Sequence, residues 1–514
     1  MQKIAVTPIF TGVTAILLSS NCQRRDYTCS FYFRQLFAVP FSVQHLEYEW
    51  SHLYAILTIS KKTEEITMNL PTIKNAFQNI KKTCQNRLEE IYPKGIPEDI
   101  NSRYAKELSF LERSDYIDDF EIFRRLSEET KKSSTIISVR GTLAGSILYY
   151  LLGNNSFNPL PPHYYCTKCG HYEIVDTHLF GIDLPQKKCP HCNNNIFADG
   201  YNLSIESVWG NTGKKILSFD YNVNSEFLPF ARRVLQSTYP DHTIVPWGMF
   251  QLNSSSGIPH PDDRIIGIGL AGFAILPSGN TIQDYPDLIS YLENGDSCIT
   301  GGSWELEEHM LKPVRLFTLK YLDELVQLQR ATGIYANDLS TKELREISWS
   351  HIYNTTLPNN SLRMLFHEFK PKTFKDMVAF DSSTHNAHSW RGNDCGGINM
   401  NEYRKVISTD SFKKYPCFTR EDFFDYMVEM GEDRTLAFDA SERIRKGHAG
   451  SCGIYHQQFL ELPIPNEIKD IAKNYLYIFP RAHSIEYILI YARLAYYAKV
   501  DSRAFTRIVF KKKS

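Results

Sequence analysis

The chain has 514 residues, of which 42% are hydrophobic and 22% are charged, and its formal net charge is −1 at pH 7. This length predicts several domains of an ordinary globular kind. The near-zero charge excludes a uniformly basic coat for nucleic acid but is compatible with a local basic groove. Eleven cysteines in so long a chain do not form a disulfide framework, which favours a reducing, cytoplasmic compartment.

The first part of the chain, residues 1–70, is rich in aromatic side chains and irregular in pattern, and we assign it no role. An apolar run from Ile4 to Leu18 weakly imitates a signal peptide. Pro8 and the missing cleavage pattern of small residues favour a buried strand or helix instead. No other segment reaches the about 18 apolar residues that span a bilayer, so we predict no membrane partner.

Residues 72–132 carry apolar side chains at helical spacing, which predicts two or three amphipathic helices. A β-like run, Ser134–Val139, then leads through a Gly-Ser turn, residues 140–146, into a helix that reaches Leu152. Such a turn places backbone N–H groups and the positive end of a helix dipole where a phosphate could bind. The candidate phosphate ligands are Arg140, Gly141, Gly145 and Ser146, although a turn of this kind is more often purely structural.

Two CxxC pairs, Cys166-Thr-Lys-Cys169 and Cys189-Pro-His-Cys192, lie within residues 158–195. A tetrahedral Zn²⁺ ion prefers four thiolates, and each CxxC turn delivers two sulfurs to one side of the metal. The alternatives are coincidence or a pair of disulfides, which this spacing makes less favourable. Because protein ligands fill all four positions, we predict that the zinc is structural and not catalytic.

The second half of the chain begins with strands and continues mainly as helix. The segment Lys214–Val223 alternates like a strand and carries Asp220 in its middle, and further strands are expected between about 260 and 276. From about Glu305 the pattern is mostly helical. Two long helical stretches run from Phe418 to Arg445 and from Asn466 to Tyr497, and we expect Pro480 to break the second.

Several separate stretches resemble one protein family, and they occur in the order in which that family has them. They are Arg140-Gly-Thr142, Asn158-Pro-Leu-Pro-Pro-His-Tyr-Tyr-Cys166, Gly181-Ile-Asp-Leu-Pro185, Lys370-Pro-Lys-Thr-Phe374, Ile444-Arg-Lys-Gly447, Phe479-Pro-Arg-Ala-His483 and Arg493-Leu-Ala-Tyr496. From roughly Arg87 to Phe510 the chain thus resembles the PolC-type DNA polymerase III alpha subunit, a family C DNA polymerase.

The resemblance implies an α+β fold with a palm of the nucleotidyltransferase type. It places a palm- and thumb-like region with the zinc knuckle in residues 71–310 and a largely helical, fingers-like region in residues 311–514. Stretches that resemble the family's exonuclease, its amidohydrolase-like domain and its C-terminal duplex-binding region are not recognised. The resemblance therefore implies a truncated relative.

The resemblance also implies nucleotidyl transfer by two Mg²⁺ ions held by three aspartates. The family's Pro-Asp-Ile-Asp strand corresponds to residues 217–220, where Ser218 replaces the first aspartate and Asp220 remains. The family's Leu-Lys-Leu-Asp-Ile-Leu-Gly strand corresponds to residues 311–317, where Val314 replaces the third aspartate and Arg315 follows it. The acidic residues at 305–308 and 323–324 are the nearest possible substitutes for the missing ligands, but their pattern is typical of a solvated helix start and of a helix face. Mg²⁺ is therefore expected only if the chain is active.

Contact with nucleic acid is implied for the fingers-like region, where basic residues cluster at helix ends. The candidates are Arg445, Lys446, Arg481 and His483, whose cationic groups suit phosphate oxygens. The alternative is a set of helix caps and ordinary surface charges.

Three functional hypotheses remain open. The first is a catalytically degenerate pseudo-polymerase that binds DNA, primed nucleic acid or a protein partner in replication, repair or defence. The second is an active minimal DNA polymerase, and the third is a purely structural subunit.

Overall fold

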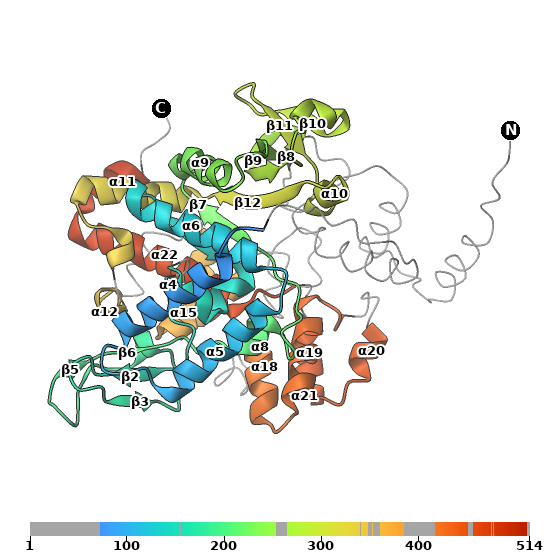
Figure 1. Ribbon diagram of the computed structural model, residues 1–514. Coiled ribbons are helices and arrows are strands. Elements are labelled where there is room, and N and C mark those ends of the chain that lie inside the picture. The colour runs from blue at the N-terminus through green and yellow to red at the C-terminus, as the bar shows by residue number, and fades with distance from the viewer. Residues whose placement is uncertain are drawn as a thin grey trace. The chain divides into compact units, whose positions relative to one another are not determined.

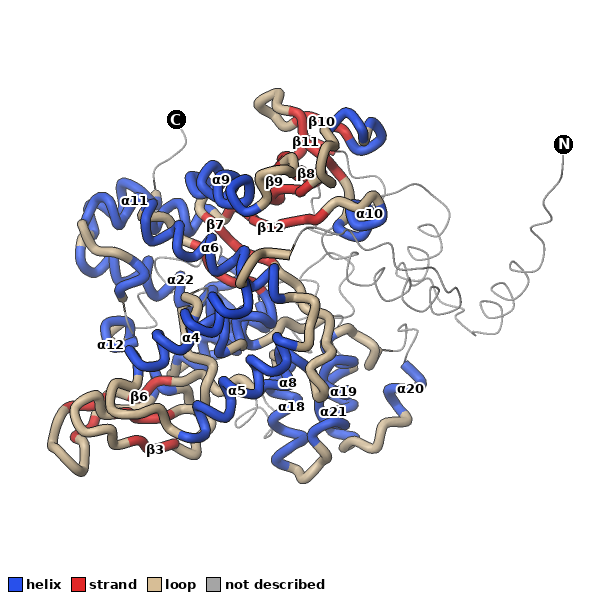
Figure 2. The backbone as a smooth tube through the Cα atoms, viewed as in Figure 1, coloured by secondary structure: helices blue, strands red, loops and turns tan. Residues whose placement is uncertain are grey.

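The computed structural model describes residues 72–153, 156–252, 265–339, 341–347, 352, 360–384, 404, 417–450, 456–473, 475 and 477–510. The N-terminal region 1–70 lies outside them, so its expected role and its apolar run stay untested. The described part combines many helices with a mixed sheet, which confirms the α+β class (Figures 1 and 2). Within it, no helix is both long and apolar enough to cross a bilayer.

Three amphipathic helices open the described chain, as the apolar spacing predicts. They are α4 (Ala76–Ile91), α5 (Glu98–Glu112) and α6 (Ile117–Ser133). In α4 the buried residues Ala76, Ile80, Cys84 and Leu88 follow one another at intervals of one helical turn, so a single stripe faces the core. Helix α4 packs against α6 and against the short helix α7 (Ile147–Leu151).

A seven-stranded mixed sheet forms the central layer, in the order β1-β7-β12-β9-β8-β11-β10. Its strands are β1 (Ile137–Arg140), β7 (Asp220–Val223), β8 (Ile244–Leu252), β9 (Ile265–Ile275), β10 (Ile289–Tyr291), β11 (Ser297–Thr300) and β12 (Lys312–Thr318). The predicted strand at 214–223 begins only at Asp220. Strand β12 lies between β7 and β9. The seven-stranded sheet thus crosses the expected domain boundary at residues 310/311, because β12 follows that boundary in the chain.

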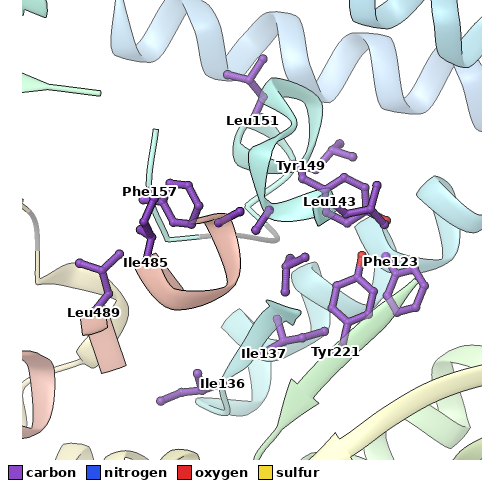
Figure 3. Close-up of a cluster of buried hydrophobic side chains, with 14 of the residues drawn as sticks. Phe123, Ile136, Ile137, Leu143, Tyr149, Leu151, Phe157, Tyr221, Ile485 and Leu489 are labelled. Atoms are coloured by element: carbon purple, nitrogen blue, oxygen red, sulfur yellow. The ribbon is translucent and has the colours of Figure 1, made fainter. Parts of the chain in front are cut away.

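The main hydrophobic core lies where β1 and β7 meet helices from both halves of the chain (Figure 3). Phe123 of α6 stacks on Tyr221 of β7, with ring centroids 3.7 Å apart. Ile485 and Leu489 reach the same core from α22 (Arg481–Val500), which packs against β1. Helices near the two ends of the described chain thus share one core, and this shared burial fixes the sheet that carries the candidate site.

The helical half of the chain has a second core of its own. The predicted helix 418–445 is broken near Gly431 into α18 (Arg420–Glu429) and α19 (Arg434–Arg445). The predicted helix 466–497 is broken, as expected, before α22, whose N-cap is Pro480. The remaining helices are α8 (Ile205–Trp209), α9 (Leu228–Thr238), α10 (Ser303–Glu308), α11 (Lys320–Thr332), α12 (Thr341–Leu344), α14 (Asn360–Phe369), α15 (Phe374–Thr384), α20 (His456–Leu460), α21 (Asn466–Ala472) and α23 (Ser502–Val509).

Gly272 in β9 is required by the close approach of β12. Its φ is +142°, and a Cβ atom added there would lie 2.0 Å from the carbonyl oxygen of Val314. Gly272 is paired with Arg315 on one side and with Trp247 of β8 on the other. A side chain at this position would push β12 away from β9.

We predict that Gly272→Ala lowers the free energy of unfolding by at least about 2 kcal/mol, because backbone atoms of β12 must move. Gly295→Ala is the matched control. Gly295 also has a positive φ, +86°, but a Cβ there meets nothing within 4 Å. Gly295→Ala should lower the free energy of unfolding by only about 1 kcal/mol, the cost of placing a side chain on a left-handed backbone. Equal destabilisation of the two variants in urea titrations would contradict the clash.

Candidate functional site

The sheet brings three of the singled-out residues onto one face at its centre. Asp220 is directly paired with Arg140 of β1 and with Arg315 of β12. Paired residues on neighbouring strands project from the same face, and so does Ser218, two residues before Asp220. Two of the three positions at which the family resemblance expects metal ligands, Ser218 and Asp220, therefore lie on one face together with two arginines.

This cluster is closed by an ion pair. The Arg315 guanidinium donates from Nη1 to Asp220 Oδ1 at 2.9 Å and to Ser218 Oγ at 3.3 Å. Ser218 in turn donates from Oγ to Asp220 Oδ2 at 2.7 Å. Arg315 also donates from Nη2 to the hydroxyl of Ser303, at the start of α10. Both oxygens of the carboxylate thus have hydrogen-bond donors from the chain itself.

The charge state of Asp220 follows from these neighbours. Burial alone would raise the pKa of its carboxyl, but the Arg315 cation, the Ser218 hydroxyl and the Arg140 cation favour the ionised form. The net effect is a pKa below the usual value. The Arg140 guanidinium lies over the ring of Phe317, 5.2 Å from its centroid. The site therefore holds one carboxylate beside two guanidinium groups.

The residue that stands level with Asp220 on β12 is Arg315 and not Val314. Val314 is buried with only 3% of its surface exposed, in the main core, and its side chain projects from the opposite face of β12. A carboxylate able to share a metal with Asp220 would have to occupy position 315. Position 315 lies one residue beyond the expected Val314, and the chain carries a cation there.

Nearby acids do not restore a carboxylate cluster. The carboxylate of Glu305 accepts from the backbone N–H of Gly302, and that of Asp323 accepts from the N–H and hydroxyl of Ser225. Glu324 pairs with Lys320 at 3.0 Å. Among the described residues, the only group of three or more histidine, cysteine or acidic side chains able to hold a metal is Cys166, Cys169, Cys189 and Cys192.

The Gly-Ser turn does not offer the phosphate site that its sequence pattern predicts. Ser146 is fully buried, and its hydroxyl donates to Glu107 Oε2 at 2.6 Å. Gly145 is buried as well, and its carbonyl accepts from Arg103. A phosphate there would face the Glu107 carboxylate, and α7 is too short to contribute a substantial dipole. Gly145 and Ser146 are therefore structural, whereas Arg140 and Gly141 lie at the open end of the turn beside Asp220.

Two of the arginines expected to contact phosphate are buried in ion pairs. Arg445 is 2% exposed and donates to Glu442 at 3.0 Å and to the hydroxyl of Tyr477. Arg481 is also 2% exposed and lies 2.9 Å from Asp422 and 2.8 Å from Asp425. Carboxylates already neutralise both charges, and this arrangement speaks against phosphate contact by either arginine.

The other two candidates in this region differ in burial. His483 is 2% exposed and stacks on Phe479, with ring centroids 4.8 Å apart. It is therefore a packed core residue and not a surface ligand. Lys446 is the C-cap of α19 and is half-buried, a place where a cation favourably meets the negative end of a helix dipole.

These buried charges form a network that joins the helical half to the rest of the chain. Glu442 of α19 accepts from Arg420 at 2.6 Å, from Arg445 and, at 3.2 Å, from Lys215, which precedes β7. Burial, followed by the neighbouring Arg420 cation, lowers the pKa of Lys215 to about 7. Breaking one such buried pair leaves an uncompensated charge, so the network ties the two regions to a single arrangement.

The four cysteines converge as their spacing predicts. Their ligand atoms all lie within 4.8 Å of one another, with Sγ–Sγ distances of 3.4 Å for Cys166 and Cys192 and 3.5 Å for Cys169 and Cys189. These separations are close to the about 3.8 Å edge of a tetrahedron with metal–sulfur bonds of about 2.3 Å. The arrangement of four soft donors on all sides fits one bound metal ion.

Short strands and tight turns hold these sulfurs in place. Strand β2 (His163–Tyr165) pairs with β3 (Tyr172–Ile174) and with β6 (Ala198–Asp199), and β4 (Lys187–Lys188) pairs with β5 (Asn195–Ile196). The N–H of Gly170 donates to the Cys166 carbonyl, and that of Asn193 donates to the Cys189 carbonyl. Both residues have a positive φ, which closes each CxxC turn.

The chain is similar in sequence to known proteins over most of its length. Residues 78–251 match the family described as the bacterial DNA polymerase III alpha NTPase domain. This segment runs from α4 to β8 and includes the four cysteines, Ser218 and Asp220. The chain is 23% identical over 484 residues to the DNA polymerase III PolC-type of Thermotoga maritima, covering 84% of this chain and 34% of that protein.

A second relative, the DNA polymerase III PolC-type of Bacillus subtilis, is 24% identical over 485 residues, which cover 83% of this chain and 32% of that protein. The chain is a PolC-like polymerase homologue. It spans about a third of the length of the curated relatives that it matches. The Asp220–Arg315 pair thus lies in a chain of polymerase ancestry.

Two further contacts in this PolC-like chain escaped the sequence reasoning. Buried Glu107 accepts from Arg103, from Ser146 and from the indole N–H of Trp209. The carboxylate of Asp183 accepts from the backbone N–H groups of Phe374 and Lys375 at the start of α15, and burial raises its pKa to about 6. An isolated acid carries no sequence signal for a partner so distant in the chain. In retrospect, Asp183 and Phe374 belong to two motifs of the family resemblance.

We predict that Asp220→Asn lowers the free energy of unfolding by about 1–3 kcal/mol at pH 7, because Arg315 loses its counter-charge in a mostly buried site. The pKa of Asp220 is lowered in the folded protein. The stabilisation is therefore complete above the unfolded value, about 3.9, and is lost as the pH falls below it. Urea titrations at several pH values measure this difference.

The control for this measurement is Glu226→Gln, which breaks the exposed pair with Arg330 and is expected to cost less than about 1 kcal/mol. The ion pair would be contradicted if the wild type and Asp220→Asn had the same free energy of unfolding at pH 7. It would also be contradicted if the excess stability of the wild type grew on acidification.

For the cysteine cluster, we predict about one equivalent of zinc in the purified wild type and much less in Cys166→Ser, because a structural site needs all four thiolates. Elemental analysis by mass spectrometry measures both. Cys84→Ser is the control, since Cys84 lies buried in α4 outside the cluster. Zinc content that is well below one equivalent in the wild type and unchanged by Cys166→Ser would refute the site.

Proposed function

We propose that this PolC-like chain is a pseudo-polymerase, which keeps the polymerase core and has lost nucleotidyl transfer. In this proposal the seven-stranded sheet is a nucleotidyltransferase-type palm, the four-cysteine cluster a structural zinc knuckle, and the region from α11 onward the fingers. The chain binds nucleic acid or a protein of a replication, repair or defence assembly. The observation that carries the proposal is the Arg315–Asp220–Ser218 cluster.

The chemistry of nucleotidyl transfer explains why this cluster matters. One Mg²⁺ must activate the primer 3′-hydroxyl and a second must neutralise the triphosphate, and Mg²⁺ accepts almost only oxygen ligands in a strict octahedron. Asp220 alone offers one carboxylate, and both of its oxygens already accept hydrogen bonds. The Arg315 cation cannot take the place of a Mg²⁺ ion. A guanidinium supplies one positive charge, but it does not coordinate oxygen ligands and so cannot activate a bound hydroxyl as a metal does.

A fixed cation also opposes metal binding directly. The Arg315 guanidinium lies 2.9 Å from the Asp220 carboxylate and repels any other cation that comes as close. An inserted Mg²⁺ would have to displace the ion pair and leave Arg315 buried without its partner. Both effects support a site that is stable without metal.

We predict no template-dependent primer extension by the wild type with Mg²⁺ or Mn²⁺. We further predict that the double variant Ser218→Asp/Arg315→Asp binds Mn²⁺ far more tightly than the wild type, because it places three carboxylates on one face of the sheet. Electron paramagnetic resonance of Mn²⁺ measures this binding directly. Asp323→Asn is a control, since Asp323 lies outside the cluster and caps a different segment.

Two results would favour the alternatives. Wild-type extension that is abolished by Asp220→Ala would identify an active minimal polymerase. Absence of any salt-dependent affinity for primed DNA would favour a purely structural subunit that acts through a protein partner.

A further inference from the structure

Helix α23 (Ser502–Val509) presents a polar face to solvent that no packing role explains. Ala504 and Phe505 are buried, and the helix packs on α11 and α22 through this apolar side. The other side exposes Ser502, Arg503, Thr506 and Arg507, which share one face by their spacing of one helical turn. Phe510 follows the helix with 58% of its surface exposed.

No acidic side chain among the described residues compensates the charge of this face. Neither Arg503 nor Arg507 has a side-chain hydrogen bond or ion pair with any described residue, whereas the exposed Arg330 and Arg87 pair with Glu226 and Glu90. Asp501 is the nearest acid in the sequence, and its carboxylate caps α23 by accepting from the N–H groups of Arg503 and Ala504. From Ser502 to Ser514 the sequence contains five basic residues and no acidic one.

Arg507 lies in the last turn of α23, where a cation favourably meets the negative end of the helix dipole, but helix stability does not account for Arg503. A cation in the first helical turn, where Arg503 lies, meets the positive end of the helix dipole and is unfavourable. Phe510 meets the ring of Phe505 edge-on, with centroids 5.9 Å apart, yet leaves 58% of its surface in water, where an apolar ring gains nothing. Contact with a ligand outside the chain would account for an exposed arginine and an exposed phenylalanine on this face.

We propose that this face of α23 binds the phosphate backbone of nucleic acid. Guanidinium groups one turn apart suit neighbouring phosphates of one strand, and the hydroxyl of Ser502 beside Arg503 is a typical phosphate ligand. The Thr506 hydroxyl donates to the Ser502 carbonyl within the helix. Phe510 at the end of the face stacks on an unpaired base, since base stacking needs an exposed aromatic ring. The proposal rests on the nucleic-acid binding proposed above and gives it a location different from the buried Arg445 and Arg481.

The test compares two double variants that remove the same charge. Arg503→Gln/Arg507→Gln removes both unpaired arginines, and Arg87→Gln/Arg330→Gln removes two exposed arginines that are paired elsewhere. All four side chains are exposed, and thermal unfolding verifies that both variants fold. Fluorescence anisotropy with a labelled DNA duplex that carries a single-stranded overhang gives the dissociation constant between 50 and 200 mM salt.

We expect Arg503→Gln/Arg507→Gln to weaken binding on the order of tenfold or more at 0.1 M salt and to reduce the slope of log K against log salt by about 2. The paired-arginine control is expected to keep the wild-type slope. Phe510→Ala should weaken binding of a single-stranded oligonucleotide by roughly fivefold or more and leave that of a blunt duplex unchanged. Wild-type affinity of Phe510→Ala for the oligonucleotide would contradict the stacking contact.

The outcomes separate the two proposals. If the wild type binds DNA and both double variants keep its slope, the assignment to α23 is overturned while the nucleic-acid function stands. If the wild type shows no salt-dependent binding at all, the nucleic-acid function itself fails. Binding of phosphatidylserine vesicles or polyglutamate that matches DNA in affinity and in its dependence on Arg503 and Arg507 would also overturn the proposal, because the face would then recognise negative charge alone.

Discussion

The insertion of β12 between β7 and β9 is the constraint on which the candidate site depends. Its parallel pairing with β7 brings Arg315 level with Asp220, and its antiparallel pairing with β9 demands a glycine at position 272. A shift of one residue in this register would turn Val314 toward Asp220 and would force Arg315 into the hydrophobic core. The apolar face of β12, which includes Val314, therefore fixes the register that pairs Arg315 with Asp220. A register shifted by one residue would bury the Arg315 charge among apolar side chains.

Buried charged side chains elsewhere in the chain hold its helices together. Arg420, Arg445 and Arg481 are each at most 2% exposed and are matched by carboxylates of the same helical region. Taking such groups out of water is costly unless every partner is present, so the network tolerates only one arrangement of its helices. Basic residues that resemble phosphate ligands in sequence thus act here as internal structural groups.

The motifs of the family resemblance also meet one another in space. Asp183, in the motif that precedes the second cysteine pair, caps α15, which begins at Phe374 in another motif. Both cysteine pairs keep all four sulfurs in reach of one metal, whereas the centre of the sheet has a cation where a carboxylate would be needed. The proposed pseudo-polymerase rests on this contrast between a complete cysteine cluster and a carboxylate that is paired with a cation.

The sequence alone determined the polymerase ancestry, the α+β class, the first three helices and the cysteine cluster. Each of these depends on local spacing: helical periodicity, two CxxC turns, or a short motif that can be recognised residue by residue. From the sequence we also expected two aspartates to be replaced, by Ser218 and Val314, whereas in the folded chain the residue level with Asp220 is Arg315.

Only the tertiary structure decided what depends on distant pairing and burial. Contacts between residues tens of positions apart set the place of β12 in the sheet and make Arg315 the partner of Asp220. Contacts of the same kind bury Ser146 and Arg481. An arginine in a sequence carries the same charge on a surface as in a core. Its function is set by whether a carboxylate or water faces it, and that is a property of the folded chain.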